Sequence, residues 1–98
     1  MTWKHRAEID QLFNAILTLQ SVEECYAFFE DACTIKEIQD IAQRLDVASH
    51  LRTGKNYHEV NQITGASTAT ICRVKKCLTY GEGYRLVLDR LHGTEDET

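Results

Sequence analysis

Apolar residues recur along this chain at positions three and four apart, which is the spacing of one face of an α-helix. There is no proline, and no Asn-Gly or Asp-Gly pair separates alternating segments as it would in a β-hairpin. The five glycines fall at the boundaries of the periodic segments. The pattern therefore predicts an all-α fold of six helices.

Three of these helices are expected to begin at a capping box, in which an N-cap side chain and a glutamate three positions later accept each other's backbone hydrogen bonds. The boxes begin at Ser21, Thr34 and Asn56. Gly54 is expected to end the third helix, and the run 80–83 to break the chain before the last one. The predicted apolar face of the third helix comprises Ile35, Ile38, Ile41, Ala42, Leu45, Ala48 and Leu51.

The segment 57–78 predicts two short helices in succession. Val60, Ile63 and Thr64 fall on one face of the first helix. The matching face of the second helix comprises Ile71, Val74 and Leu78. Each helix thus has one apolar side for packing and leaves its other side to solvent or to a partner.

A glycine-centred turn joins these two helices. Gly65 stands where the first helix must stop, because glycine adopts a left-handed C-terminal cap without steric cost. Ser67 follows as the expected N-cap of the second helix, with its hydroxyl placed to accept from the backbone N–H of Ala69 or Thr70. This is the layout of a helix-turn-helix, whose second helix enters the DNA major groove.

A chain of 98 residues has the size of one domain. We expect a single helical DNA-binding domain over residues 1–93, in which 1–53 forms dimerisation helices. The helix-turn-helix is expected over 56–79 and a C-terminal helix over 83–92. The acidic residues 94–98 are expected to form a frayed tail.

The first predicted helix, around Ile9 to Leu17, has a broad apolar face and no partner of equal length within the chain. At about 25 cal/mol per Å², leaving several such side chains in water forgoes roughly several kcal/mol. We therefore expect a homodimer formed through the N-terminal helices. Such a dimer sets two recognition helices about one DNA turn apart.

The formal charge is distributed unevenly along the chain. The net charge is −4, yet residues 55–80 carry four bases against one acid. Residues 21–40 carry six acids against one base, and 95–97 are all acidic. The one positive stretch is thus the predicted helix-turn-helix, which the acidic remainder would orient toward phosphate.

The sequence gives little support for metal binding, catalysis or secretion. The cysteines at 25, 33, 72 and 77 form no CxxC pair, and the histidines at 5, 50, 58 and 92 are scattered, so we expect no metal site. No catalytic motif is present, so an enzyme and a cofactor are not expected. The N-terminus lacks the apolar core of a signal peptide, and reduced thiols fit a cytoplasmic protein without a membrane partner.

The expected partner is therefore double-stranded DNA, read by a recognition helix over 68–78. Small and hydroxylated residues at its start allow close approach to base edges, whereas lysines further along suit phosphates. The candidate DNA-binding residues are Tyr57, His58, Asn61, Ser67, Thr68, Ala69, Thr70, Cys72, Arg73, Lys75 and Lys76. The alternative is a helical protein-interaction module that keeps the fold without binding DNA, which the net acidity favours.

The block from Thr34 to about Leu91 resembles the Trp repressor superfamily, and within it the YerC/YecD branch. The most specific piece is the string GASTATICR at 65–73, preceded at family-like spacing by Arg44. The resemblance implies an intertwined all-helical dimer whose two helix-turn-helix heads bind a palindromic operator. It also implies transcriptional regulation, usually repression.

In the tryptophan-binding member of that family, the corepressor lies between the third helix and the recognition helix. The resemblance matches Arg44 and Arg73 to the arginines that flank this ligand, and Thr34 to a threonine that holds its amino end. Val74 stands where that member has glycine, and Cys77 where it has serine. A β-branched side chain takes up the volume of the indole ring, so we expect no tryptophan site. A different small effector, held by Thr34, Arg44, Arg73 and Cys77, stays an alternative.

Overall fold

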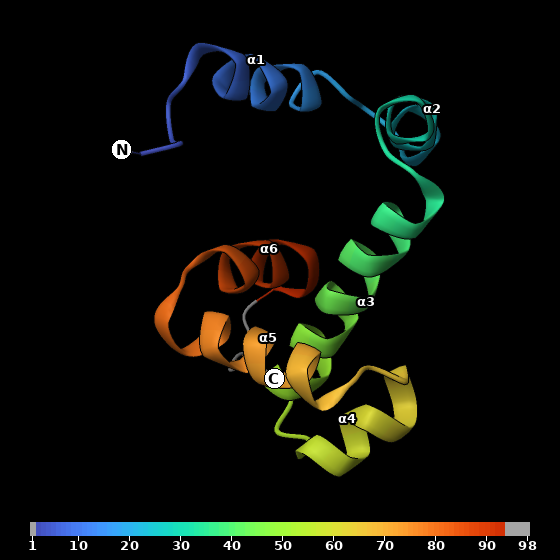
Figure 1. Ribbon diagram of the computed structural model, residues 1–98, viewed down its shortest axis with the longest axis vertical. Coiled ribbons are helices and arrows are strands. Elements are labelled where there is room, and N and C mark those ends of the chain that lie inside the picture. Colours follow the sequence, from blue (N-terminus) through green and yellow to red (C-terminus); the bar gives the residue numbers. More distant parts are fainter. Residues whose placement is uncertain (1, 94–98) are drawn as a thin grey trace. The chain divides into compact units, whose positions relative to one another are not determined.

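The computed structural model describes residues 2–93, which form six α-helices and, within that range, no β-strand (Figure 1). The predicted all-α fold is therefore confirmed. The expected tail at 94–98 lies outside the described residues. The helices are α1 (Ala7–Ile16), α2 (Val22–Ala32), α3 (Ile35–Arg52), α4 (Tyr57–Thr64), α5 (Thr68–Tyr80) and α6 (Gly83–His92).

The chain divides into two compact units, and the division falls in the first turn of α3, between Ile38 and Gln39. The first unit contains α1 and α2. No side chain of either helix is buried. The large apolar side chains that stay exposed on them are Leu12, Phe13, Val22 and Tyr26, with Leu17 just beyond α1. Taken by itself, this unit does not cover its own apolar surface.

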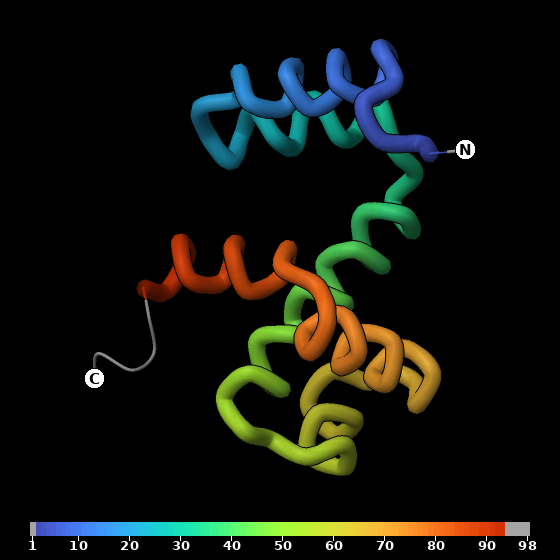
Figure 2. Tube along the Cα trace, turned by 90° about the vertical axis from the view of Figure 1, so that its left-hand side faces the viewer, coloured from blue at the N-terminus to red at the C-terminus, as the bar shows by residue number. Residues whose placement is uncertain are grey.

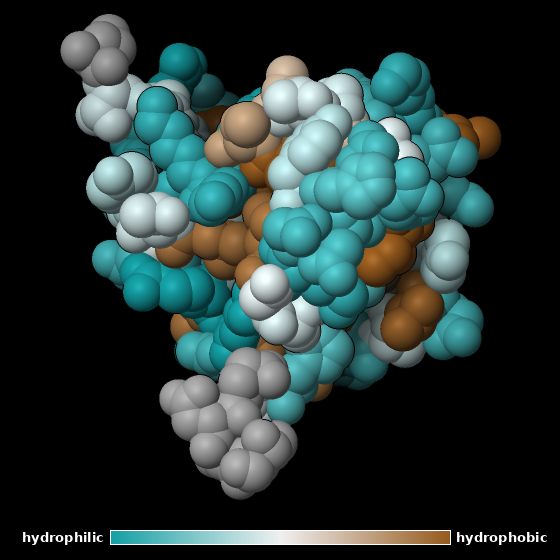
Figure 3. Space-filling view, turned by 90° about the horizontal axis from the view of Figure 1, so that it is seen from below, coloured by the Kyte–Doolittle hydropathy of each residue, from teal (hydrophilic) through white to brown (hydrophobic). Residues whose placement is uncertain are grey.

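The hydrophobic core belongs to the second unit. Within it α5 contacts both α4 and α6, and Figure 2 follows the chain from the end of α3 through these three helices. Seen from below, the molecule presents mainly hydrophilic residues, with apolar ones visible among them (Figure 3). The buried core residues are Val47, Ala48, Val60, Ala66, Ile71, Val74 and Leu88.

Two details of the apolar pattern differ from the sequence expectation. On α3, Ile35 and Ile41 remain 74% and 52% exposed, whereas Val47, which was not expected on the inner face, is completely buried. On α4, Ile63 is 52% exposed although it was expected beside the buried Val60. In both helices the buried stripe is narrower than the apolar one, because packing covers only the side that meets other helices of the unit.

The helix boundaries follow the predicted caps closely. The Asn56 box is complete, since Asn56 Oδ1 accepts from Glu59 N and Glu59 Oε1 accepts from Asn56 N, both at 2.9 Å. The box at Thr34 is complete as well. At Ser21 the hydroxyl accepts from Glu24 N at 3.1 Å, but the carboxylate of Glu24 accepts from the backbone of Gln20 instead of Ser21. α5 continues two residues beyond the predicted end of the recognition helix.

Candidate nucleic-acid interface

The turn between α4 and α5 has the conformation that its glycine predicts. Gly65 is the C-cap of α4 in the left-handed region, with φ of 73° and ψ of 5°. Its N–H donates to the carbonyl of Asn61 at 2.9 Å. A Cβ built on Gly65 meets nothing within 4 Å, so the requirement for glycine comes from the backbone conformation alone.

Two side chains of α4 hold this turn in place. The hydroxyl of Thr64 donates to the carbonyl of Val60 at 2.7 Å and accepts from the N–H of Ala66 at 3.1 Å. The amide of Asn61 donates to the carbonyl of Ala66 at 2.8 Å. Ala66 itself is 1% exposed, so its peptide groups depend on these partners for hydrogen bonding. The start of α5 is therefore fixed relative to α4.

Asn61 was predicted as a DNA contact. Its Nδ2 already donates inside the protein and its side chain is half-buried, which gives it a structural task in the turn. The burial of Ala66 was also not foreseen. The small size of the residue that directly follows the turn glycine is the sequence feature that could have indicated this burial.

Ser67 caps α5 as predicted. Its Oγ accepts from the N–H of Thr70 at 3.2 Å and lies 3.1 Å from the Thr70 hydroxyl, to which it donates. Both hydroxyls are therefore engaged at the first turn of α5. Thr70 is also half-buried, whereas Ser67 stays exposed. Of the two, Ser67 is the one that solvent or a ligand can reach.

The two sides of α5 are clearly distinct. Ile71 and Val74 are 2% and 1% exposed and anchor the helix in the core, and Leu78 packs against that core. The remaining candidates of this helix point outward. The exposed residues are Thr68, Ala69, Cys72, Arg73, Lys75 and Lys76. The structure thus brings the small N-terminal residues and the cations of α5 together on the surface.

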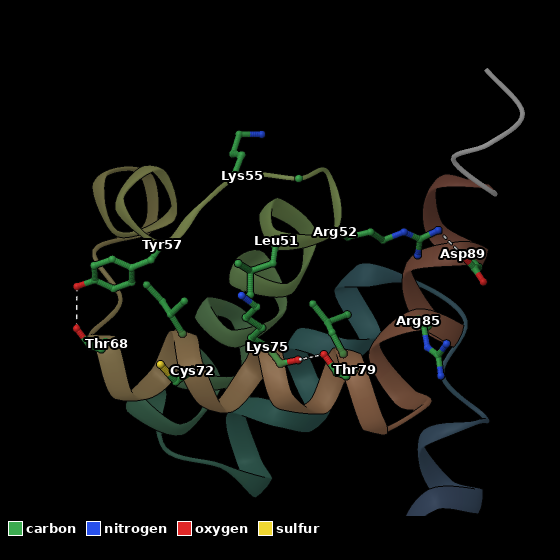
Figure 4. Close-up of a pocket in the computed structure, with 13 residues that line it drawn as sticks. Leu51, Arg52, Lys55, Tyr57, Thr68, Cys72, Lys75, Thr79, Arg85 and Asp89 are labelled. Carbon is green, nitrogen blue, oxygen red and sulfur yellow. Dashed lines mark hydrogen bonds and ion pairs between the residues drawn. The ribbon is translucent and has the colours of Figure 1, made fainter.

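A hydrogen bond links the first residues of α4 and α5. The hydroxyl of Tyr57 lies 2.8 Å from the hydroxyl of Thr68 (Figure 4), and both side chains are exposed. His58, next to Tyr57, is exposed as well. Tyr57 thereby positions the Thr68 side chain at the beginning of α5.

The family model described as Trp repressor protein matches residues 7–92. The chain belongs to the Trp repressor family. The uncharacterized protein YerC of Bacillus subtilis (strain 168) is 60% identical over 92 residues, which are 93% of this chain and 88% of YerC. The predicted resemblance to the YerC branch is confirmed.

Solved structures agree with this membership of the Trp repressor family. A Staphylococcus aureus protein, proposed in its description to be a Trp repressor, superposes with a TM-score of 0.87 at 49% identity, covering 92% of this chain and 91% of that one. A TrpR-like protein from Eubacterium eligens ATCC 27750 gives 0.87 at 48% identity, with 93% and 95% covered. Family and fold together suggest a DNA-binding regulator with a helix-turn-helix.

The residues that the sequence resemblance implied for an effector site have varied surroundings in the structure. Arg44 is half-buried, and Arg73 and Cys77 are exposed. The hydroxyl of Thr34 accepts from the N–H of Glu37 at 3.1 Å as the N-cap of α3. Val74, at the position where the tryptophan-binding member has glycine, is part of the core. Its buried isopropyl group fills space that glycine would leave open.

No group of three or more His, Cys, Asp or Glu side chains within residues 2–93 is arranged to hold a metal ion. The four cysteines are free thiols. In the part of the chain that the structure describes, no helix has both the length and the apolar composition needed to cross a membrane.

Proposed function

We propose that this protein is a sequence-specific DNA-binding transcriptional regulator, a repressor, and that α5 is the helix that enters the major groove. The observation that carries the proposal is the division of α5 into a buried side, with Ile71 and Val74, and an exposed start, with Thr68 and Ala69. Small side chains at the N-terminal end let the backbone of a recognition helix come close to base edges.

The charged residues of α5 support the same assignment. Lys75 and Lys76 follow the small residues along the exposed side, at positions suited to phosphate contacts. Lysine offers a compact charge that adds affinity without reading sequence. We assign Lys75 and Lys76 to the DNA backbone, and Thr68, Ala69 and Cys72 to base recognition.

We further propose that the regulator acts as a homodimer in the cytoplasm. The exposed apolar side chains of α1 and α2 support this, because neither helix buries a single side chain within the chain itself. A second copy supplies the missing cover. Two recognition helices related by a two-fold axis then fit a palindromic site with half-sites about 34–36 Å apart.

We also infer that tryptophan is not the effector. The isopropyl group of Val74 occupies core volume, and the thiol of Cys77 is a weak acceptor for an ammonium group. Titration with tryptophan should therefore leave the melting temperature unchanged. A rise that grows with tryptophan concentration would contradict this inference.

The deciding experiment for DNA binding uses fluorescence anisotropy with labelled duplexes selected from random sequence, measured from low to physiological salt. Each phosphate neutralised by a lysine makes the slope of log K against log salt more negative by about 0.9. Two lysines in each chain of a dimer therefore account for a slope of roughly −3.6. The variant Lys75→Ala/Lys76→Ala should lose most of that slope and bind all duplexes more weakly.

The matched control removes two cations outside the helix-turn-helix, Lys4 and Arg90, both exposed. Lys4→Ala/Arg90→Ala should keep the wild-type slope. Substitutions at Thr68 should change which duplexes are selected while leaving the salt slope intact. Absence of salt-dependent binding to any duplex would refute the proposal. It would leave a protein-interaction module, for which DNA would not compete with partner binding.

A further inference from the structure

A pocket of about 660 Å³ lies in the second unit beside α5 (Figure 4). This volume is within the range of about 300–1,000 Å³ that is typical of small-molecule sites. Its walls come from the end of α3, the segment that follows it, the start of α4, one side of α5, and α6. The residues that the sequence resemblance implied for the corepressor site do not line it; they are Thr34, Arg44, Arg73 and Cys77.

The floor of this pocket is apolar. Ile71 contributes from the core and is 2% exposed, and Leu51 and Leu78 are half-buried beside it. An apolar ligand body placed on these three side chains would leave water for a hydrocarbon surface. Residues that line ligand sites elsewhere in proteins are of this kind, with a few polar groups that fix orientation.

The rim of the pocket is strongly cationic. Four basic side chains and one carboxylate line it, in a chain whose net charge is −4. The basic residues come from α3, the following segment, α5 and α6, so the fold gathers charges that are far apart in sequence. They are Arg52, Lys55, Lys75 and Arg85, and the carboxylate is Asp89.

These cations differ in how far the protein neutralises them. Arg52 forms an ion pair with Asp89. The ammonium of Lys55 donates to the hydroxyl of Thr53 at 3.1 Å. The Lys75 side chain extends from α5 toward the end of α3 in Figure 4. Its ammonium group makes no hydrogen bond or ion pair with the described residues. Of these four cations, Lys75 is therefore the one whose donors are not engaged by the described residues.

Arg85 stands on the α6 side of the pocket. One guanidinium nitrogen donates to the carbonyl of Gly81 at 2.8 Å, which fixes the side chain near the start of α6. An arginine has five N–H donors, so donors remain for an anion. Carboxylate, sulfonate and phosphate groups are its preferred partners.

We propose that this pocket binds a small organic anion, with its apolar ring-sized body on Leu51, Ile71 and Leu78 and its charged group at the cationic rim, to which Lys75 and Arg85 belong. The anionic group is a carboxylate, a sulfonate or a phosphate, and an uncharged molecule of the same shape binds more weakly. The site differs from the one that the corepressor of the family occupies.

Occupancy of the pocket has a regulatory consequence, which rests on the proposed function. Tyr57, Thr68, Cys72 and Lys75 line the pocket and also belong to the surface assigned to DNA. Lys75 cannot neutralise a ligand anion and a phosphate at the same time. The organic anion is therefore an inducer that releases the protein from DNA.

The first step of the test uses no DNA. Anilinonaphthalene sulfonate serves as a fluorescent organic anion, and N-phenylnaphthylamine as its uncharged counterpart, each titrated into the full-length protein. The anion should bind at one site per chain and about tenfold or more tighter than the neutral probe, because a charge-assisted hydrogen bond contributes that much or more. Equal affinity of the two probes would overturn the proposal.

Two variants with the same change of charge locate the bound probe. Arg85→Glu should weaken binding of the anionic probe about tenfold or more, whereas Arg90→Glu, on the same helix but outside the pocket, should leave it unchanged. If circular dichroism shows that Arg85→Glu loses helix, Lys75→Glu, which has the same change of charge, replaces it. Identical affinities in the pocket variant and in the Arg90 control would place the probe elsewhere and reject the site.

In the second step, duplex DNA is added to the protein loaded with the probe. The fluorescence should fall as DNA binds, and the anion should raise the apparent Kd for DNA in the anisotropy assay. A probe signal that persists at saturating DNA would refute competition. Because the first step involves no duplex, it decides on the pocket even for a protein that binds no DNA.

Discussion

Replacing Asn61 by alanine removes the donor that holds the turn between the two helices of the helix-turn-helix. The bond from Asn61 Nδ2 to the carbonyl of Ala66 is 2.8 Å long and part-buried. Its loss costs about 0.5–1.5 kcal/mol, and a carbonyl left without a partner adds to that. Alanine recovers up to about 0.7 kcal/mol of helix propensity. We expect a net loss of about 1 kcal/mol in the free energy of unfolding.

The variant Asn61→Asp sharpens this expectation. It keeps the shape of the side chain but sets a carboxylate oxygen against the carbonyl of Ala66, where the amide now donates. The donor is lost and a repulsion is added, so the destabilisation should exceed that of Asn61→Ala and reach about 2 kcal/mol or more. In a domain of this size, 1 kcal/mol corresponds to about 4–8 °C in Tm.

The measurement is thermal unfolding followed by circular dichroism at one fixed protein concentration, because the proposed dimerisation makes the Tm depend on concentration. Gln62→Ala is the matched control, since Gln62 is the exposed neighbour on the same helix. DNA affinity is recorded for each variant in parallel. The structural role of Asn61 is refuted if Asn61→Ala has the same Tm as Gln62→Ala while its DNA affinity falls. Asn61 would then be a direct DNA contact instead of a part of the turn.

Three other predictions concern separate features of the second unit. Gly81→Ala brings a Cβ within 2.9 Å of a backbone carbonyl of α5 and should cost about 1–3 kcal/mol, whereas Gly83→Ala meets nothing within 4 Å and serves as its control in urea unfolding. Tyr57→Phe removes the hydroxyl bonded to Thr68; sequence selection should broaden at one base position of each half-site, and unchanged selection would contradict the positioning role. Val74→Ala should lower stability by about 2 kcal/mol, and an unmoved unfolding midpoint would speak against its place in the core.

The helix boundaries could be predicted from the sequence because their signals are local. A capping box such as that of Asn56 and Glu59, or a left-handed glycine such as Gly65, acts over a few residues whatever the rest of the chain does. The apolar face of α5 was foreseen for a related reason. Ile71 and Val74 are its central apolar residues at helical spacing, so periodicity points to them directly.

The buried stripe of α3 could not be predicted in the same way. That helix has apolar residues on more than one side, and only contacts with other helices decide that Val47 is covered while Ile41 stays exposed. The spacing of residues in the sequence shows which positions of a helix are apolar. Contacts with other helices determine which of those positions are buried. The exposure of Ile63 on α4 has the same origin.

Only part of the candidate site could be predicted from the sequence. The exposed residues of α5 follow from one helical pattern and were foreseen together. Asn61 has a polar side chain, which sequence alone could not distinguish between a DNA contact and a turn hydrogen bond. Arg85 reaches the same pocket as Lys55 only because α6 returns beside α5, and no local signal joins two residues so far apart in sequence.

The division of α5 into an anchored and an exposed side has a consequence for how such a regulator diverges. Thr68, Ala69 and Cys72 lie outside the core, so exchanging them alters few buried contacts and leaves the free energy of unfolding nearly unchanged. With the proposed role of α5 in DNA recognition, a duplicated gene could acquire a new target by a handful of tolerated substitutions while Ile71 and Val74 keep the helix in place. With the same role, this helix would be a scaffold on which new DNA preferences can be selected in the laboratory.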